Sequence, residues 1–129
     1  MQSIRPFLMF EGKAEEAMTL YVSVFGGKIN DVTRYAAGQA GAEGSVMRAS
    51  FTIGEQTVLC IDSPGKHDFT FTPSFSMFVD CDSQEEQATF YERLLEGGTA
   101  LMPLGEYGFS RRFGWLKDRF GISWQLNLP

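Results

Sequence analysis

A short helical sequence occurs twice in this chain of 129 residues. EEAMTLY begins at residue 15, and EEQATFY begins 70 positions later, at residue 85. Four of the seven positions match outright, and Leu20 against Phe90 is an apolar exchange. Each copy is followed by a Gly-Gly pair, at 26–27 and 97–98, and glycine is typical of helix ends. These matches indicate that the chain consists of two copies of one structural unit.

The residues around each copy predict the same order of elements: strand, helix, strand, strand, strand. Apolar residues at helical spacing predict helices at 13–25 and 84–96. The second helix follows a capping box, in which Ser83 accepts from the third amide and Glu86 reaches back to the cap residue. Strands are predicted at 3–10, 28–35, 45–53, 56–62, 74–81, 99–103, 109–116 and 122–128, with a Gly- and Ala-rich loop at 36–44.

A duplicated βαβββ unit predicts an α+β fold with two curved mixed sheets. Each sheet should carry a helix on its outer face, and the inner faces should surround a cavity. The length is that of one domain, with module one at about 1–62, a linker at 63–73 and module two at 74–129. Cys60 and Cys81 lie in apolar runs, so we expect buried, reduced thiols in a cytoplasmic protein rather than a disulfide.

The charge balance argues against two classes of partner. The formal net charge is −5, whereas nucleic acids and anionic membranes require a basic patch. No apolar run approaches the roughly 20 residues that cross a bilayer, and the N-terminus lacks a signal-peptide pattern. We therefore expect a cytoplasmic protein without nucleic-acid or membrane partners.

Four stretches resemble a known family. They are IRPFLMFEGKAEEAMTLYVSVFGG, VMRASFTIG, FTFTPSFSMFVDC and FGWLKDRFGISWQL. They resemble the PhnB-like family, also called 3-demethylubiquinone-9 3-methyltransferase-like, of the vicinal oxygen chelate superfamily. That superfamily includes glyoxalase I, extradiol dioxygenases and bleomycin-resistance proteins. The resemblance covers nearly the whole chain and implies the fold expected above, together with a homodimer.

The resemblance also implies where a metal would bind. Enzymes of the superfamily typically hold a divalent cation with His and Glu side chains, at positions that fall near Pro6, Cys60, Ser74 and Gln125. Proline has no ligand atom, and serine and glutamine are poor ligands without a carboxylate beside them. We therefore expect no metal and no cofactor. A methyltransferase cofactor would need a Gly-rich turn that opens a helix, and no helical pattern follows the glycines of 38–44.

Strand alternation assigns candidate ligand-binding residues. It places Val46, Arg48, Ser50 and Thr52 on the polar side of 45–53, opposite an apolar side of Met47, Ala49, Phe51 and Ile53. In 122–128 it places Gln125 on the polar side, with Ser123 and Asn127. An inward Arg48 needs a partner, which is either an anionic ligand or a buried carboxylate. Arg111 and Arg112 are neighbours, so only one of them points inward. The predicted ligand-binding residues are Arg48, Ser50, Cys60, Arg112 and Gln125.

Two function classes remain open at this stage. The first is a small-molecule-binding protein whose metal site is lost. The second is an enzyme of the glyoxalase/dioxygenase or demethylubiquinone methyltransferase-like type. No catalytic residue can be assigned, because the single His67 lies in the linker and fits a solvated loop as well as a general base. Cys60 could act as a nucleophile only if its pKa were lowered, and otherwise it is a small core residue. The sequence does not identify the ligand.

Overall fold

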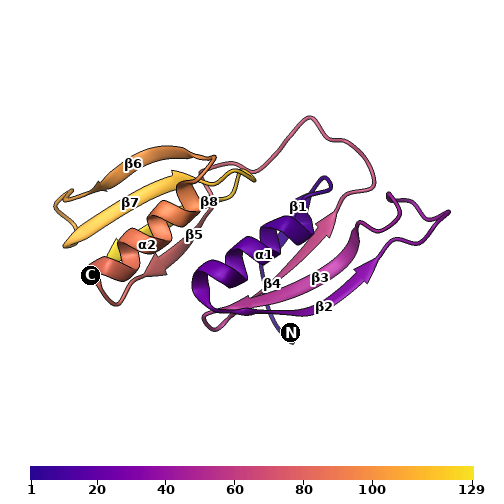
Figure 1. Cartoon of the computed structure of the whole chain (residues 1–129), viewed down its shortest axis with the longest axis horizontal. Helices are drawn as coiled ribbons and strands as arrows, with labels where there is room; N and C mark the ends of the chain where they lie inside the picture. Colours follow the sequence, from indigo (N-terminus) through magenta and orange to yellow (C-terminus); the bar gives the residue numbers. More distant parts are fainter. The chain divides into compact units, whose positions relative to one another are not determined.

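The computed structural model describes residues 1–129, which divide into two compact units, Met1–Asp68 and Phe69–Pro129. Each unit has the order βαβββ (Figure 1), which confirms the predicted α+β fold of two similar halves. The first unit contains β1 (Phe7–Phe10), α1 (Ala14–Phe25), β2 (Lys28–Arg34), β3 (Val46–Ile53) and β4 (Gln56–Asp62). The second contains β5 (Ser76–Asp80), α2 (Gln84–Leu95), β6 (Thr99–Gly105), β7 (Arg112–Lys117) and β8 (Ser123–Leu128).

The two sheets have the same topology. Their strand orders are β1-β4-β3-β2 and β5-β8-β7-β6. In each, the first strand of the unit pairs in parallel with the last strand, and the remaining pairs are antiparallel. Both sheets are therefore mixed, as predicted. Each helix lies across one face of its own sheet (Figure 1), so each sheet has a helix-covered face and a helix-free face.

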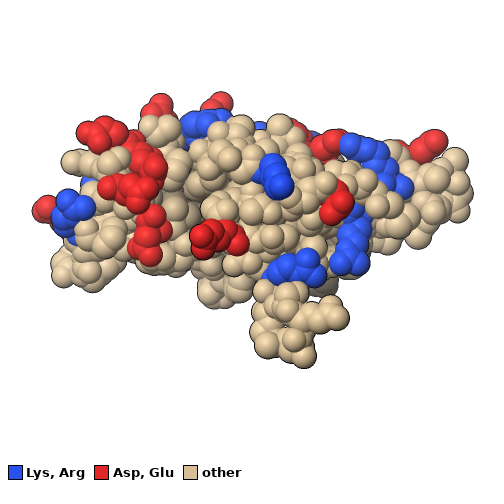
Figure 2. Space-filling view, turned by 90° about the horizontal axis from the view of Figure 1, so that it is seen from below, with Lys and Arg blue, Asp and Glu red and all other residues tan.

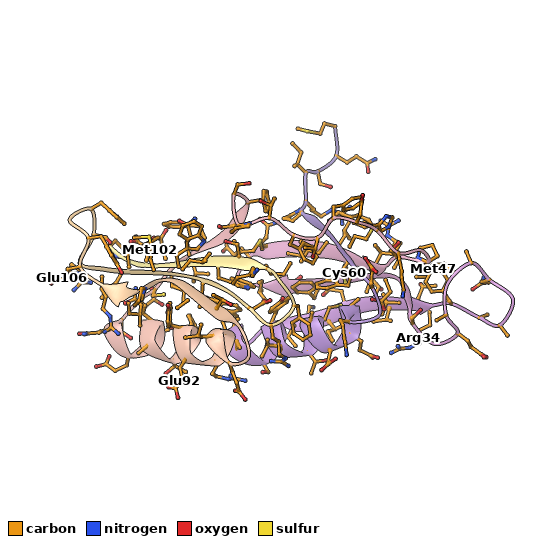
Figure 3. All side chains as sticks on the ribbon, turned by 90° about the horizontal axis from the view of Figure 1, so that it is seen from above. Arg34, Met47, Cys60, Glu92, Met102 and Glu106 are labelled. Atoms are coloured by element: carbon orange, nitrogen blue, oxygen red, sulfur yellow. The ribbon has the colours of Figure 1, made fainter.

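The core of each unit lies between helix and sheet. In α1, Ala17, Met18 and Tyr21 are completely buried, and the Tyr21 ring lies 5.9 Å from that of Phe51 on β3. In α2, Tyr91 and Leu94 face the sheet, whereas Glu92 points away from it (Figure 3). This amphipathic arrangement follows from the helical spacing of the apolar residues. Neither helix is long and apolar enough to cross a membrane. Figure 2 shows Lys and Arg interspersed with Asp and Glu on the face it draws.

The two helices begin differently. Ser83 caps α2 as predicted, because its Oγ accepts from Glu86 N at 3.1 Å. The Glu86 carboxylate accepts from Asp82 N at 3.0 Å, one residue before the expected partner. Helix α1 has no side-chain cap from its own flank. Instead Asp62, at the end of β4, accepts from Gly12 N and Ala14 N, both at 2.9 Å. The first helix is therefore capped across the sheet.

The Gly-Gly pairs have two separate roles. Gly26 ends α1 in the left-handed region with φ 75°, and Gly97 has φ 76°, which L-residues rarely adopt. The second glycine of each pair is held close to a neighbouring strand. A Cβ on Gly27 would lie 1.9 Å from Thr52 O, and one on Gly98 would lie 2.2 Å from Lys117 O. Glycine is thus required at both places for steric reasons that differ from helix termination.

A β-bulge in β3 changes the predicted faces. The pairing of β2 with β3 shifts register between Thr33, which pairs with Arg48, and Arg34, which pairs with Val46. Val46 is consequently buried at 1% exposure, on the same side as Ala49, while Met47 is half-exposed. The predicted grouping of Val46 with Arg48, and of Met47 with Ala49, is wrong. An extra residue in one strand shifts the alternation that the prediction assumed to be continuous.

Three strands begin clearly later than predicted. Strand β1 begins at Phe7, not at residue 3. Strand β5 begins at Ser76, because a turn closed by Phe75 N to Thr72 O (3.2 Å) precedes it. Strand β7 begins at Arg112, because the loop before it folds back through Tyr107, whose hydroxyl donates to Pro103 O at 2.5 Å. Each turn directly precedes its strand, and sequence composition alone does not fix the first paired residue after such a turn.

Candidate functional site

The helix-free face of the second sheet combines polar side chains with aromatic rings. Register places three rows of side chains across it: Ser76, Ser123 and Lys117, then Phe78, Gln125 and Trp115, then Asp80, Asn127 and Phe113. The opposite face packs under α2, because Gln87 Nε2 donates to Leu126 O at 3.0 Å and a Cβ on Gly114 would meet the Tyr91 ring at 2.7 Å. Gln125 is therefore central on the helix-free face, with a ring on either side.

Gln125 is fixed by a chain of hydrogen bonds. Its Nε2 donates to Ser76 Oγ at 3.1 Å, and Ser76 Oγ lies 2.6 Å from Ser123 Oγ. Ser123 also accepts from Trp115 Nε1 at 2.8 Å and donates to Pro73 O at 3.4 Å. The Ser76–Ser123 bond can run in either direction, because each hydroxyl can donate, and in both cases Ser76 Oγ accepts from Gln125 Nε2. The bond from Gln125 directs its amide nitrogen toward Ser76 and leaves Oε1 as an acceptor.

Aromatic rings border this network. Phe113 is 5% exposed, because the Phe109 ring lies edge-on at 4.9 Å and the Tyr107 ring edge-on at 6.3 Å. Phe78 lies 6.5 Å from Phe113 and is 57% exposed. Tyr107 and Phe109 are themselves 42% and 63% exposed. Exposed aromatic side chains grouped on one surface commonly mark a binding site.

The first sheet carries the other predicted polar residues. Arg48 is exposed on β3, and Ser50 is nearly buried beside it, at 9%. The structure contains two salt bridges, Lys13–Glu16 and Arg34–Glu15, and neither involves Arg48. The buried carboxylate considered as a partner for Arg48 is therefore not found. Arg48 and Ser50 stay predictions as ligand-binding residues.

Cys60 lies in the core of the first unit. It pairs with Ala49 and Leu8, both buried, and is itself completely buried. It therefore lies on the helix-covered face, opposite Ser50. Burial, with a further contribution from the nearby Asp62 charge, raises the pKa of the Cys60 thiol to about 12. A thiol with this pKa is a weak nucleophile and a weak metal ligand at neutral pH. This placement agrees with a core residue and not with a ligand contact.

The two neighbouring arginines lie at the end of the second sheet. Arg111 precedes β7, and its Nε donates to Pro129 O at 2.6 Å. Arg112 pairs with Leu128, so alternation groups it with Gly114 on the helix-covered face. Arg112 is thus separated from Gln125, which lies on the other face, although both were predicted together. The arginine sharing the parity of Phe113 and Trp115 is Arg111, as alternation predicts.

The residues at the implied metal positions do not fit a divalent cation. Pro6 offers only its carbonyl, which accepts from Leu59 N at 2.9 Å. Ser74 lies before β5, and its hydroxyl is 3.1 Å from Thr72 Oγ1. Gln125 donates its amide hydrogen to Ser76, and Cys60 is buried. Nowhere do three or more His, Cys, Asp or Glu side chains come together as metal ligands. His67 is exposed in the first unit, and its Nε2 lies 2.8 Å from Ser63 Oγ.

The sequence reasoning missed two buried carboxylates. Asp62 is 3% exposed and accepts from three backbone amides, including Val46 N at 3.0 Å. Asp118 is 2% exposed and accepts from Phe120 N, Ile122 N and Trp124 Nε1 at 2.8–3.0 Å. Both are saturated by donors of the chain, so both stabilise the fold. An acidic residue directly after or before an apolar strand was the available signal.

Comparisons with known proteins agree on one family. Residues 2–127 match the family described as 3-demethylubiquinone-9 3-methyltransferase. The PhnB protein from Bacillus cereus is 50% identical, with a TM-score of 0.96 over 99% of this chain and 100% of that one. Protein YjdN of Escherichia coli is 20% identical over 97% of this chain and 94% of its own length.

A more distant structure shows the fold. A glyoxylase/bleomycin resistance protein/dioxygenase domain from Frankia is 14% identical, with a TM-score of 0.66 over 99% of this chain and 92% of that one. The fold is therefore the glyoxalase/bleomycin-resistance fold that the duplicated units predicted. From the match along almost the whole sequence and the 50% identity to a PhnB protein, the chain belongs to the PhnB-like, 3-demethylubiquinone-9 3-methyltransferase family.

Proposed function

We propose that the protein binds a small organic molecule on the helix-free face of the second sheet, without a divalent cation held by His and Glu. The observation that carries this proposal is Gln125. At the position where the resemblance implies a metal-binding Glu, the chain has a neutral amide that donates to Ser76 Oγ at 3.1 Å. The network continues through Ser123 and Trp115, which are also uncharged.

The composition of this face supports ligand binding. Small-molecule sites are mostly apolar, with a few polar groups that fix orientation. Phe78, Phe109 and Tyr107 supply exposed apolar area, and Gln125 supplies a polar group held in one orientation. A site of this kind binds and orients a ligand without the divalent metal ion that enzymes of the superfamily typically hold.

An enzyme remains the second candidate, because the family description names a methyltransferase. The Gly-rich segment does not support an S-adenosylmethionine site, since residues 36–44 connect the antiparallel strands β2 and β3 and no helix follows them. Calorimetric titration of the purified protein with S-adenosylmethionine tests this candidate. Saturable binding would favour the enzyme.

The proposal is tested by NMR with a library of small neutral aromatic compounds. The chain has two tryptophans, and only Trp115 lies on the helix-free face, while Trp124 donates to the buried Asp118 at 2.9 Å. We expect binders to shift the indole N–H signal of Trp115 and leave that of Trp124 unchanged, equally in protein treated with EDTA. Binding that appears only after zinc or manganese is supplied would overturn the proposal.

A further inference from the structure

The hydrogen-bond order around Gln125 limits the chemistry of the ligand, and this inference rests on the function proposed above. Gln125 Nε2 gives one of its two hydrogens to Ser76 Oγ, so one N–H and the carbonyl Oε1 stay available to a ligand. No N–H or O–H group of the chain donates to Gln125 Oε1. A half-buried amide therefore presents the acceptor Oε1 beside one remaining N–H, and a network that ends at Pro73 O holds it in place.

The groups around this acceptor are uncharged. In its own row, Gln125 lies between Phe78 and Trp115. Charged residues occupy opposite corners of the face: Lys117 in the row of Ser123, and Asp80 in the row of Asn127. Asp80 is already paired with Asn127 Nδ2 at 2.9 Å. An anionic group placed at Gln125 would lose its water without gaining an adjacent cation.

The rings give the shape of the ligand. Phe78 and Trp115 lie on either side of the Gln125 amide in the strand register. Phe113 lies in the next row, with the rings of Phe109 and Tyr107 packed edge-on against it. Flat ligands stack on such rings or meet their edges, with a gain beyond that of apolar burial. A flat ring that carries an N–H or O–H can reach Oε1 and the flanking rings together.

We propose that the ligand is an uncharged, planar aromatic molecule that donates a ring N–H or a phenolic O–H to Gln125 Oε1. Its ring lies against Phe78 and Trp115. The donor replaces the water that otherwise solvates Oε1, and the ring covers apolar surface that the unit leaves exposed.

Three probes separate the elements of this proposal: indole, benzofuran and indole-3-carboxylate. Indole and benzofuran have nearly the same shape, but indole donates where benzofuran can only accept. We expect indole to shift the Trp115 indole N–H signal at millimolar concentration and to bind about tenfold more tightly than benzofuran, as one lost hydrogen bond predicts. Indole-3-carboxylate should bind more weakly than indole.

Two variants locate the contacts. Gln125→Leu should abolish the preference for indole over benzofuran, and Phe78→Ala should weaken both probes. Phe7→Ala is the matched control, because Phe7 is 54% exposed on the first sheet, close to the 57% of Phe78. It should leave all three affinities unchanged. Circular dichroism melts of each variant verify that the fold is retained.

The outcomes are distinguishable. Binding of benzofuran or of indole-3-carboxylate as tightly as indole, with Trp115 still shifted, overturns the ligand class but leaves the proposed function. No shift of Trp115 by any probe overturns both. Sedimentation velocity tests whether a second copy of the chain occupies this face instead of a ligand. If Phe78→Ala turns a dimer into a monomer while Phe7→Ala does not, a second copy covers the face and the ligand proposal is wrong.

Discussion

Replacing Gly27 by alanine should destabilise the first unit strongly, although Gly27 needs no unusual φ. The residue directly precedes Lys28, which pairs with Thr52 at the start of β2. An added Cβ would lie 1.9 Å from Thr52 O, whereas real Cβ contacts essentially never fall below 3.0 Å. The obstacle is a backbone carbonyl in an inner strand, so it cannot rotate away as a side chain could.

The magnitude follows from the cost of overpacking. Forced backbone shifts cost typically 1–3 kcal/mol, and a clash of about 1 Å with backbone belongs at the upper end, at about 3 kcal/mol. For a chain of this size that corresponds to a fall of about 10 °C in melting temperature. Gly98→Ala should behave similarly, because Gly98 precedes Thr99, which pairs with Lys117, and its Cβ would lie 2.2 Å from Lys117 O.

Gly65→Ala is the control. Nothing lies within 4 Å of a Cβ at Gly65, so alanine there should be neutral or stabilise by up to about 1 kcal/mol through the unfolded chain. Thermal and urea unfolding, followed by circular dichroism, measure all three variants. A melting temperature for Gly27→Ala equal to that of Gly65→Ala would refute the steric argument.

Three further predictions concern charged and titratable groups. Arg48→Met should change stability by less than about 0.5 kcal/mol in a thermal melt, because Arg48 is exposed and has no carboxylate partner; if phosphate raises the melting temperature of the wild type and not of the variant, Arg48 binds anions. Asp62→Asn should lower the free energy of unfolding in urea by about 2–3 kcal/mol. The side-chain amide nitrogen that replaces one carboxylate oxygen would face a backbone N–H, either Val46 N at 3.0 Å or one of the other two amides that donate to Asp62. Burial raises the pKa of Cys60 from 9.0 to about 12 and that of Cys81 to about 11. The native thiols should therefore resist iodoacetamide at pH 8, and thiols that react as fast as free cysteine would contradict this burial. Both thiols have a raised pKa in the folded protein, so their protonated forms make their full contribution to stability below pH 9.0. That contribution is lost as the pH rises toward 11–12, and thermal melts in that range would detect the loss.

The fold was predictable because its main signals are local. The repeated helix, the capping residue Ser83 and the apolar spacing of each strand all act within a few residues. The β3 bulge at Met47 was not predictable in this way, because it depends on how β2 pairs with β3 around Arg34. Alternation carried past a bulge assigns the wrong face to every residue on one side of it, which is why Val46 and Met47 were exchanged.

The candidate site was predictable only in part for the same reason. Gln125 could be placed on the polar side of its strand. Its partner Ser76, however, lies on another strand, and 47 positions of sequence separate Ser76 from Ser123, the other serine of the network. Parallel register between β5 and β8 brings them together. Cys60 was included because it lies near a metal position that the resemblance implies, and Arg112 because one of two neighbouring arginines had to point inward. Parity along the strands places both on helix-covered faces.

Comparison of the two units separates structural from functional residues. Gly27 and Gly98 occupy the same place before the second strand of their unit, and each approaches the carbonyl of the residue that pairs with the strand's first residue. The helix-covered faces thus keep one construction twice. The helix-free faces differ, since the first bears the exposed Arg48, whereas the second bears an uncharged amide between rings, with Lys117 and Asp80 at opposite corners. Packing requires the first kind of residue in both units, but it gives no reason for exposed rings around a fixed acceptor. The asymmetry between the helix-free faces is therefore where selection for a ligand, rather than for the fold, would act.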